Sequence, residues 1–233
     1  RINNWFNCKS QILQSRPNFD DNEADAVYKY MKGDNFFTEF KYTAELEKVI
    51  SKYIGCKYCV MVNNGTVSLV LALLALDIGV GCDVIVPNYT MIASINAIKM
   101  VGARPIIIDV DFNNFVITLD CIKKALTPNT KAIMHVSLNN HTNDIATIES
   151  YCKENGIYLI EDAAQSLGCR INGRHIGTFG IIGSFSLSTP KIISTGQGGF
   201  LITNDDHIYS KMCKIKNFGR KTGGIDDFEI FGL

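Results

Sequence analysis

From residue 43 onward the sequence alternates between helical stretches and short apolar runs, and this alternation restricts the fold more than any other feature. The apolar runs are rich in β-branched residues and end at polar residues, glycine or proline, as buried strands do. They cover residues 58–63, 83–88, 104–110, 131–138 and 156–162. Near-continuous apolar strands joined by helices indicate a mostly parallel sheet covered on both faces. We therefore predict an α/β fold with helices flanking the sheet.

Helical spacing of apolar residues predicts the connecting elements and the limits of the domain. Helices are expected at residues 44–55, 66–79, 90–102, 118–126 and 143–156. Between Cys169 and Asp205 the alternation gives way to turns and strands, before a last helix at 207–217. The opening residues are polar and aromatic, with one helix at 22–32 that ends at Gly33. We divide the chain into an N-terminal arm and helix, 1–42, and a large α/β domain, 43–233.

The charge balance excludes several classes of partner. Lys and Arg total 23, and Asp and Glu also total 23, so no bulk positive field attracts nucleic acid or an anionic membrane. No apolar run approaches the roughly 18 to 20 residues of a bilayer span, and the polar opening lacks the apolar core of a signal peptide. The four histidines have no metal-like spacing. We expect a cytoplasmic protein without a metal site that binds neither nucleic acid nor membrane.

In an open parallel sheet, ligands bind beyond the carboxyl ends of the strands, so we expect the site residues directly after the strands. Residues 63–66 read NNGT, where a strand turns directly into a helix. Gly65 permits a tight backbone, and the free amides of the helix start together with the Thr66 hydroxyl form a candidate phosphate cradle. An ordinary helix cap by Asn64 or Thr66 explains the same residues.

Two further strand ends carry an aromatic ring and a pair of carboxylates. Tyr89 follows the strand at 83–88 and could stack on a flat ligand, although a packed surface tyrosine fits as well. Glu161 and Asp162 end the strand at 156–162, and side-chain alternation points them in opposite directions. They are therefore not a paired general acid and base. The one that faces the edge of the sheet could hold a protonated ring nitrogen or cap a helix.

A lysine follows the fourth strand end. Lys191 lies after the run GSFSLSTP and before the glycine-rich turn TGQGG. Small and hydroxyl residues on both sides hold it where its amine could be partly desolvated, which would favour a neutral nucleophile suited to a Schiff base, although a surface lysine is the ordinary alternative. A phosphate cradle, a stacking ring, a carboxylate for a pyridine nitrogen and this lysine together match pyridoxal 5′-phosphate (PLP).

Five segments then follow in a specific order: NNGTVSL, PNYTMIASINAI, KAIMHV, IEDAAQSLG and GSFSLSTPKIISTGQGGFLIT. Together they resemble the PLP-dependent nucleotide-sugar aminotransferases of the DegT/StrS type, over nearly the whole chain from about Pro17. EDAAQSLG combined with FSxxxxK and TGxGG is the most specific part. The resemblance implies PLP-dependent transferase fold type I, the fold of aspartate aminotransferase.

The resemblance also assigns the chemistry around the PLP ring. The lysine matching Lys191 carries PLP through a Schiff base and, once displaced, moves the proton during amino transfer. Asp162, in EDAAQS, keeps the pyridine nitrogen protonated, so that Lys191 and Asp162 are the expected catalytic residues. Gln165 is expected to bond the phenolic oxygen of PLP or to lie against the ring.

The remaining cofactor contacts implied by the resemblance concern the phosphate and the ring face. Thr66, the amides around Gly65 to Val67, and Ser186 are expected to bind the phosphate, while Tyr89 covers the ring. Two departures from the family pattern affect neighbouring segments. The residues after the KAI strand read HVSLNNHT where relatives often have HLYG, and Gln197 replaces the usual glutamate of TGxGG.

By this resemblance the expected function is transfer of an amino group from glutamate to a nucleoside-diphosphate 4-keto-6-deoxy sugar, as in perosamine- and viosamine-type 4-aminotransferases. PLP-dependent sugar dehydratases are similar, but carry a histidine in place of the Schiff-base lysine. A noncatalytic PLP-fold sensor or scaffold is the other alternative, because relatives have a further C-terminal domain that we expect this chain to lack. Relatives also form homodimers, and an aromatic arm could support such a contact or simply pack in the core: Trp5, Phe6, Phe19, Phe36, Phe37 and Phe40.

Overall fold

The computed structural model describes residues 17–33, 41–142, 144–221 and 227–232. The α-helices within these ranges are α1 (Asp21–Lys32), α2 (Lys41–Ile54), α3 (Gly65–Ala75), α4 (Ala93–Met100), α5 (Leu119–Ala125), α6 (Ile145–Glu154) and α7 (Asp206–Lys216). The strands are β1 (Tyr58–Val62), β2 (Asp83–Pro87), β3 (Arg104–Ile108), β4 (Thr130–Val136), β5 (Tyr158–Asp162), β6 (Arg170–Ile171), β7 (Arg174–His175), β8 (Ile182–Ser186) and β9 (Gly199–Thr203). A short 3-10 helix, η1 (Leu138–Asn140), follows β4.

Seven of these strands form one sheet, in the order β1-β9-β8-β5-β4-β2-β3, while β6 and β7 form a small separate hairpin. Strands β3, β2, β4, β5 and β8 pair in parallel. Strand β9 lies antiparallel to both β1 and β8, so it alone among the seven runs in the opposite direction. The prediction of a mostly parallel sheet is therefore confirmed.

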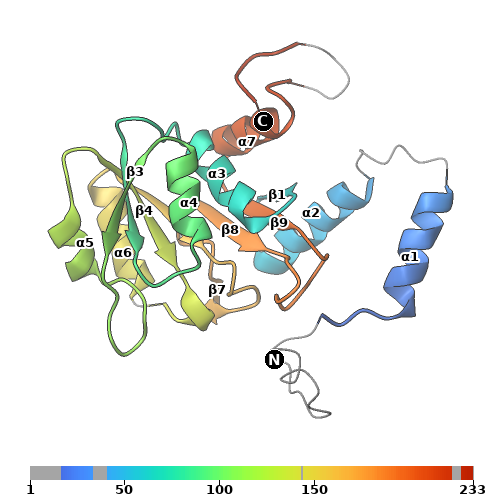
Figure 1. Ribbon diagram of the computed structural model, residues 1–233, viewed down its shortest axis with the longest axis horizontal. Helices are drawn as coiled ribbons and strands as arrows, with labels where there is room; N and C mark the ends of the chain where they lie inside the picture. The colour runs from blue at the N-terminus through green and yellow to red at the C-terminus, as the bar shows by residue number, and fades with distance from the viewer. Residues whose placement is uncertain (1–16, 34–40, 143, 222–226, 233) are drawn as a thin grey trace, which may run out of the picture.

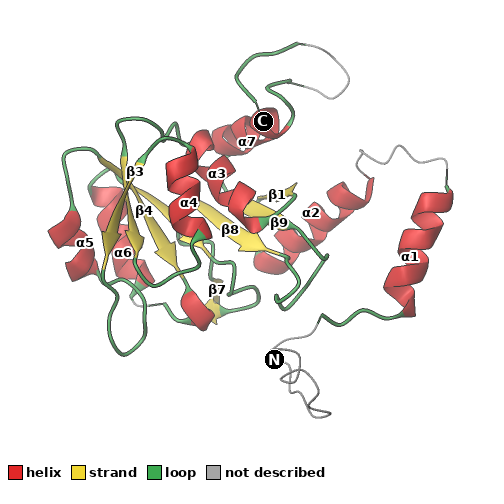
Figure 2. Cartoon of the chain, viewed as in Figure 1, coloured by secondary structure: helices red, strands yellow, loops and turns green. Residues whose placement is uncertain are grey.

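Helices cover both faces of the sheet, as Figures 1 and 2 show. On one face α3, α4 and α7 enclose a core built on alternate strand residues such as Val86 and Met134. On the other face α5 and α6 cover the intervening residues, including Ile85 and Ile133, and α2 covers the β1-β9-β8 end. Helix α3 is apolar on all sides because it lies between the sheet and the helices α4 and α7.

Element boundaries differ from the predicted ones mainly where loops approach the sheet edge. The helix expected at 90–102 begins at Ala93, because residues 90–92 form a turn between β2 and α4. The helix expected at 66–79 begins at Gly65 and ends at Ala75. None of the helices in the described ranges is long and apolar enough to cross a membrane.

The N-terminal helix α1 lies apart from the sheet (Figure 1) and has no buried residue. Its first turn carries a capping box in which Asp20 and Glu23 bond each other's backbone amides, so the cap stabilises it locally. Of the aromatic arm proposed from the sequence, Phe19 is exposed, and the other five aromatic residues lie outside the described residues. The division into an arm and a large domain stays a prediction.

Candidate functional site

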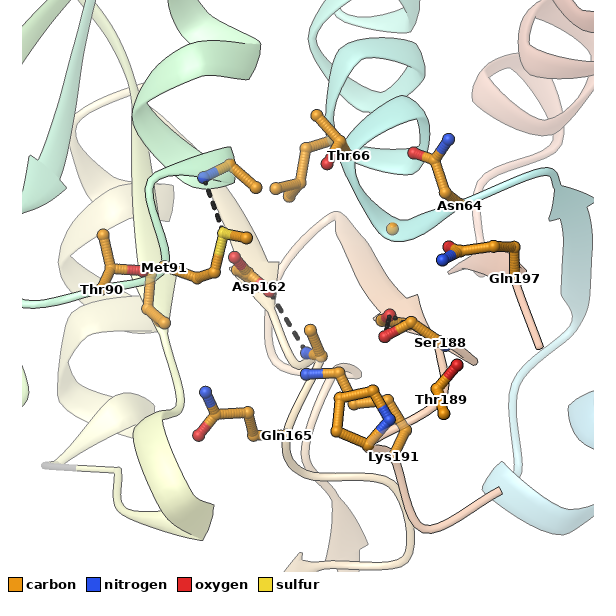
Figure 3. Close-up of a pocket in the computed structure, with 17 residues that line it drawn as sticks. Asn64, Thr66, Thr90, Met91, Asp162, Gln165, Ser188, Thr189, Lys191 and Gln197 are labelled. Carbon is orange, nitrogen blue, oxygen red and sulfur yellow. Dashed lines mark hydrogen bonds between the residues drawn. The ribbon is translucent and has the colours of Figure 1, made fainter. Parts of the chain in front are cut away.

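A cavity of about 430 Å³ lies at the carboxyl edge of the sheet, where the sequence predicted a site. Its walls come from the β1–α3 turn, the β2–α4 turn, the ends of β4, β5 and β8, and the loop between β8 and β9. Figure 3 shows labelled side chains from the two turns, from β5 and from the loop after β8 around the same space. Because each segment comes from a different part of the chain, the parallel topology is what assembles the site.

The start of α3 forms one wall. Asn64 caps this helix: its side-chain Oδ1 accepts the Val67 amide at 2.8 Å, and its carbonyl accepts the Ser68 amide at 3.1 Å. The two remaining amides of the first turn, those of Gly65 and Thr66, precede the first intrahelical bonds and are available to a ligand. The cap and the cradle that the sequence left as alternatives therefore coexist. A helix start with two available amides favours an anion.

Close packing against β8 places a second set of donors beside these amides. A Cβ added at Gly65 would lie 2.9 Å from Ser186 Cβ, so only glycine allows the two segments to approach this closely. Ser186 lines the cavity, and its Oγ lies 3.1 Å from Ser188 Oγ. The hydroxyls of Thr66, Ser186 and Ser188 therefore surround the start of the helix and can donate to the oxygens of a phosphate.

Asp162 lies at the base of the cavity and is 6% exposed. Its Oδ2 accepts a hydrogen bond from Ser94 Oγ at 2.7 Å, and its Oδ1 accepts one from the Ala164 amide at 3.2 Å. Burial raises the pKa of Asp162, whereas both hydrogen bonds and the charge of Lys191 oppose that rise. Glu161 projects from the other face and accepts amides of the 177–180 turn, so the predicted opposite directions of the two carboxylates are confirmed.

Lys191 is half-buried and directs its amine toward Asp162 in Figure 3. Burial lowers the pKa of Lys191, and the negative charge of Asp162 opposes this. A lysine with a lowered pKa has a larger neutral, nucleophilic fraction at neutral pH. Gln165 also lines the cavity, and its Oε1 accepts the Asn139 amide at 2.8 Å. This bond fixes the carboxamide at the boundary with the loop that follows β4.

Two residues expected at the cofactor lie elsewhere. Tyr89 is 56% exposed, does not line the cavity, and packs against Phe115 with ring centroids 5.4 Å apart. Val67 lines a different cavity, and its amide is already taken by the Asn64 cap. Met91, two residues after Tyr89, reaches the cavity instead. Residues 90–92 form a turn and not the first turn of a helix, and in this turn Met91 lines the cavity whereas Tyr89 does not. The predicted helix start at residue 90 did not anticipate this arrangement.

The sequence did not identify Asn64, Thr90, Ser188 and Gln197 as wall residues of the cavity, nor Ser94, which is buried and bonds Asp162. Thr90 and Ser94 are four residues apart, a spacing that places two side chains on one helical face. The spacing could be recognised in the sequence, but only the structure shows that Ser94 bonds Asp162 and that Thr90 bonds Ser94. Gln197, where the resembled family usually has glutamate, contributes a neutral carboxamide to the wall.

The groups present fit PLP. The cradle that a Cβ at Gly65 would fill suits the phosphate, and the hydroxyls around it add donors. A buried carboxylate suits a protonated ring nitrogen, and a half-buried amine suits an aldehyde. A second cavity of about 470 Å³ shares Gln165, Ser186 and Lys191 with the first and provides adjoining space.

Comparisons with known proteins agree with this chemistry. The chain is 34% identical over 207 residues to a GDP-perosamine synthase of Vibrio cholerae, which covers 89% of this chain and 56% of that protein. The crystal structure of an aminotransferase from Psychrobacter cryohalolentis superposes with a TM-score of 0.87 at 35% identity, covering 95% of this chain and 59% of that one. A GDP-4-keto-6-deoxymannose-3-dehydratase superposes with a TM-score of 0.85 at 28% identity, covering 96% of this chain and 59% of the other.

The chain therefore spans about three fifths of the length of these relatives. The superposed structures confirm the predicted fold of type I PLP enzymes. Residues 17–230 match the sequence pattern of a single family of PLP-dependent enzymes, and this match covers most of the chain. The chain belongs to the DegT/DnrJ/EryC1/StrS aminotransferase family.

Proposed function

We propose that this chain binds PLP and transfers an amino group from glutamate to a nucleoside-diphosphate-linked 4-keto-6-deoxy sugar. The observation that carries the proposal is the pair formed by Lys191 and Asp162, which face each other across one cavity beside a phosphate-binding helix start. The perosamine synthases among the relatives support the sugar class.

The α3 start and Ser186, the last residue of β8, would hold the phosphate. The Gly65 and Thr66 amides, the Thr66 hydroxyl and the Ser186 hydroxyl supply four neutral donors in a partly enclosed site. Hydrogen bonds to a charged acceptor contribute about 1.5 to 3 kcal/mol each. Since no Lys or Arg other than Lys191 lines this cavity within the described residues, the phosphate charge is stabilised by oriented dipoles.

Asp162 and Lys191 divide the proton chemistry between them. Bound PLP supplies an electron-accepting ring that stabilises negative charge on the carbon bearing the amino group. Asp162 accepts a hydrogen bond from the ring nitrogen and keeps that nitrogen protonated. Lys191 would anchor the aldehyde and, when free, its neutral amine would take the proton from the substrate Cα and deliver it to the C4′ carbon of the cofactor. Proton transfer by a positioned base of this kind contributes roughly 100- to 10,000-fold.

Met91 takes the place proposed for Tyr89. Its thioether lies in the cavity wall, and its Sδ lies 3.2 Å from the Ala93 amide, which orients the side chain. A polarizable sulfur packs well against an aromatic ring, so Met91 is suited to cover one face of the cofactor. The adjoining cavity, lined in part by Asn139 and Asn140, offers carboxamides that suit the hydroxyls of a sugar.

The proposal is tested on the purified chain reconstituted with PLP. We expect a PLP absorbance band, bleaching on addition of glutamate, and recovery on addition of one member of a panel of nucleotide 4-keto sugars. Borohydride should fix the cofactor covalently to wild type and to Lys191-containing controls such as Lys99→Ala, an exposed lysine of α4. Lys191→Ala should bind PLP without covalent fixation. Covalent fixation in Lys191→Ala would refute the assignment of the lysine.

A sugar 3-dehydratase is a second candidate, favoured by the structural neighbour of that class. The family resemblance places a histidine at the Schiff-base position of dehydratases, and this chain has Lys191 there. Mass analysis of the sugar product separates the two: amino transfer replaces the keto oxygen by an amino group, and dehydration removes water. PLP binding without conversion of any sugar would instead support a noncatalytic sensor or scaffold.

We also propose that the protein acts as a homodimer. Large apolar side chains are exposed at residues that line the two cavities or flank them: Tyr89, Met91, Ile92, Ile192 and Ile193. Exposed apolar patches of this kind mark contact surfaces in soluble proteins. Light scattering of the purified chain should give twice the monomer mass of 25.8 kDa, and Ile192→Asp should shift it toward the monomer. A wild-type mass of one chain at micromolar concentration would contradict this proposal.

A further inference from the structure

Two hydroxyl side chains stand behind the Asp162 carboxylate. Ser94, in the first turn of α4, is fully buried, and its Oγ donates to Asp162 Oδ2 at 2.7 Å. The same Ser94 oxygen lies 2.9 Å from Thr90 Oγ1. A hydroxyl has one proton, and the carboxylate at 2.7 Å is a better acceptor than the Met91 carbonyl at 3.3 Å. Thr90 is therefore the donor to Ser94, and the hydrogen bonds run from Thr90 through Ser94 to Asp162.

This chain of hydroxyls fixes the orientation of the carboxylate. The Ala164 amide holds Oδ1 and Ser94 holds Oδ2, so the carboxylate plane is set from two sides. The donor on Oδ1 is backbone and belongs to the turn after β5. The donor on Oδ2 comes from a residue 68 positions away, on a different helix. The shortest hydrogen bond of the Ser94 hydroxyl is the one to Asp162, and the Thr90 hydroxyl bonds Ser94.

Few charged groups lie near Asp162, so the Ser94 hydrogen bond is an important influence on whether its carboxyl group is ionised. Lys191 is the charged residue of the described chain that faces Asp162 across the cavity. Glu161 faces the other side of the sheet, α3 carries no charged residue, and Lys99 lies in the last turn of α4. Burial favours the protonated carboxyl, and the Ser94 hydrogen bond favours the carboxylate. Cooperative bonding from Thr90 polarises Ser94 and strengthens its bond.

We propose that Thr90 and Ser94 are positioning residues that hold the Asp162 carboxylate ionised and directed into the cavity. The role of that carboxylate toward the ring nitrogen rests on the proposed function. The ionisation of Asp162 does not, since it is a property of the cofactor-free chain. Ser94 acts through Asp162 and has no part in the reacting atoms.

The test follows the Asp162 carboxyl by carbon-13 NMR as a function of pH in the cofactor-free chain, with Asp162→Asn identifying the signal. We expect Ser94→Ala to raise proton affinity at Asp162 at least tenfold, or one pH unit, and Ser94→Thr to restore the wild-type midpoint. Alanine and threonine both change the side-chain volume at position 94, but only alanine removes the hydroxyl. If Ser94 acted through packing alone, both variants would therefore shift the midpoint. An unchanged midpoint in folded Ser94→Ala, or no rescue by Ser94→Thr, would overturn the proposal.

Thr90→Val keeps the experiment decisive if Ser94→Ala does not fold. It removes the outer hydroxyl alone and should raise the proton affinity of Asp162 about threefold, whereas Thr90→Ser should not. No change in Thr90→Val would overturn the proposed relay. With nitrogen-15-labelled PLP, Ser94→Ala should also move the ring-nitrogen signal toward the unprotonated position. A chain that shows the Asp162 shift yet binds no PLP would refute the proposed function and support the positioning role.

Discussion

Replacing Gly65 by alanine tests whether the close approach of α3 and β8 creates the phosphate cradle. The new Cβ would lie 2.9 Å from Ser186 Cβ, whereas non-bonded carbons prefer about 3.5 to 4.0 Å. The two segments must therefore separate by roughly 0.6 to 1.1 Å. Hydrogen bonds span only about 2.7 to 3.2 Å, so a phosphate would lose its contacts to one side. The loss of one charge-assisted bond, about 1.5 to 3 kcal/mol, weakens PLP binding roughly 10- to 150-fold.

Equilibrium dialysis of the cofactor-free chain against PLP measures this change, and urea unfolding separates it from a loss of stability. Overpacking costs about 1 to 3 kcal/mol, and alanine recovers about 0.5 to 1 kcal/mol of helix propensity, so the variant should remain folded. Gly79→Ala is the matched control, because its Cβ would lie 3.3 Å from the Val101 carbonyl, beyond the far end of α3. It should leave PLP affinity unchanged. Wild-type affinity in Gly65→Ala would refute the cradle.

Three further predictions concern the packing and electrostatics that support the site. Asn64→Ala removes the cap on the Val67 amide and should lower the free energy of unfolding by about 1 kcal/mol in urea, while Asn64→Ser should retain most of it. Burial raises the pKa of Glu161 from 4.5 to about 7, so its protonated form stabilises the fold below pH 4.5, and that stabilisation is lost as pH rises through 7. We expect up to about 3 kcal/mol of pH-dependent stability across this window, absent in Glu161→Gln, and an identical pH profile in the variant would contradict the assignment. Gly177→Ala places a Cβ 2.4 Å from Phe185 Cζ at a backbone φ of +97°, and it should cost at least about 2 kcal/mol by thermal unfolding; an unchanged melting temperature would show that the turn relaxes freely.

Much of the fold was predictable because hydrophobic spacing reports burial directly. The apolar run of β5 is covered on both faces, and its last two residues, Glu161 and Asp162, face opposite sides as strand alternation requires. The reversed direction of β9 was not predictable. A short buried strand carries the same apolar pattern whichever way it runs, and its direction depends on partners distant in sequence.

The site was predictable to the extent that function depends on strand ends. Asp162 ends β5, Gly65, Thr66 and Lys191 come after strands, and all four lie together in the structure. The prediction failed where Tyr89 was expected to line the cavity and Met91 does so instead. A three-residue turn can direct either side chain inward, and the local sequence contains no signal for which one.

The position of β9 between β1 and β8 has a consequence for synthesis of the chain. Gly199 packs against the backbone of Asn64, 135 positions earlier, so the cradle cannot close until β9 has left the ribosome. Before that point β1 and β8 both have open edges, and an open edge can pair with other chains. Contacts this distant in sequence also form slowly. Nascent chains that end before residue 199 should therefore depend on chaperones, and the ability to retain a cofactor should arise abruptly with the last strand of the sheet.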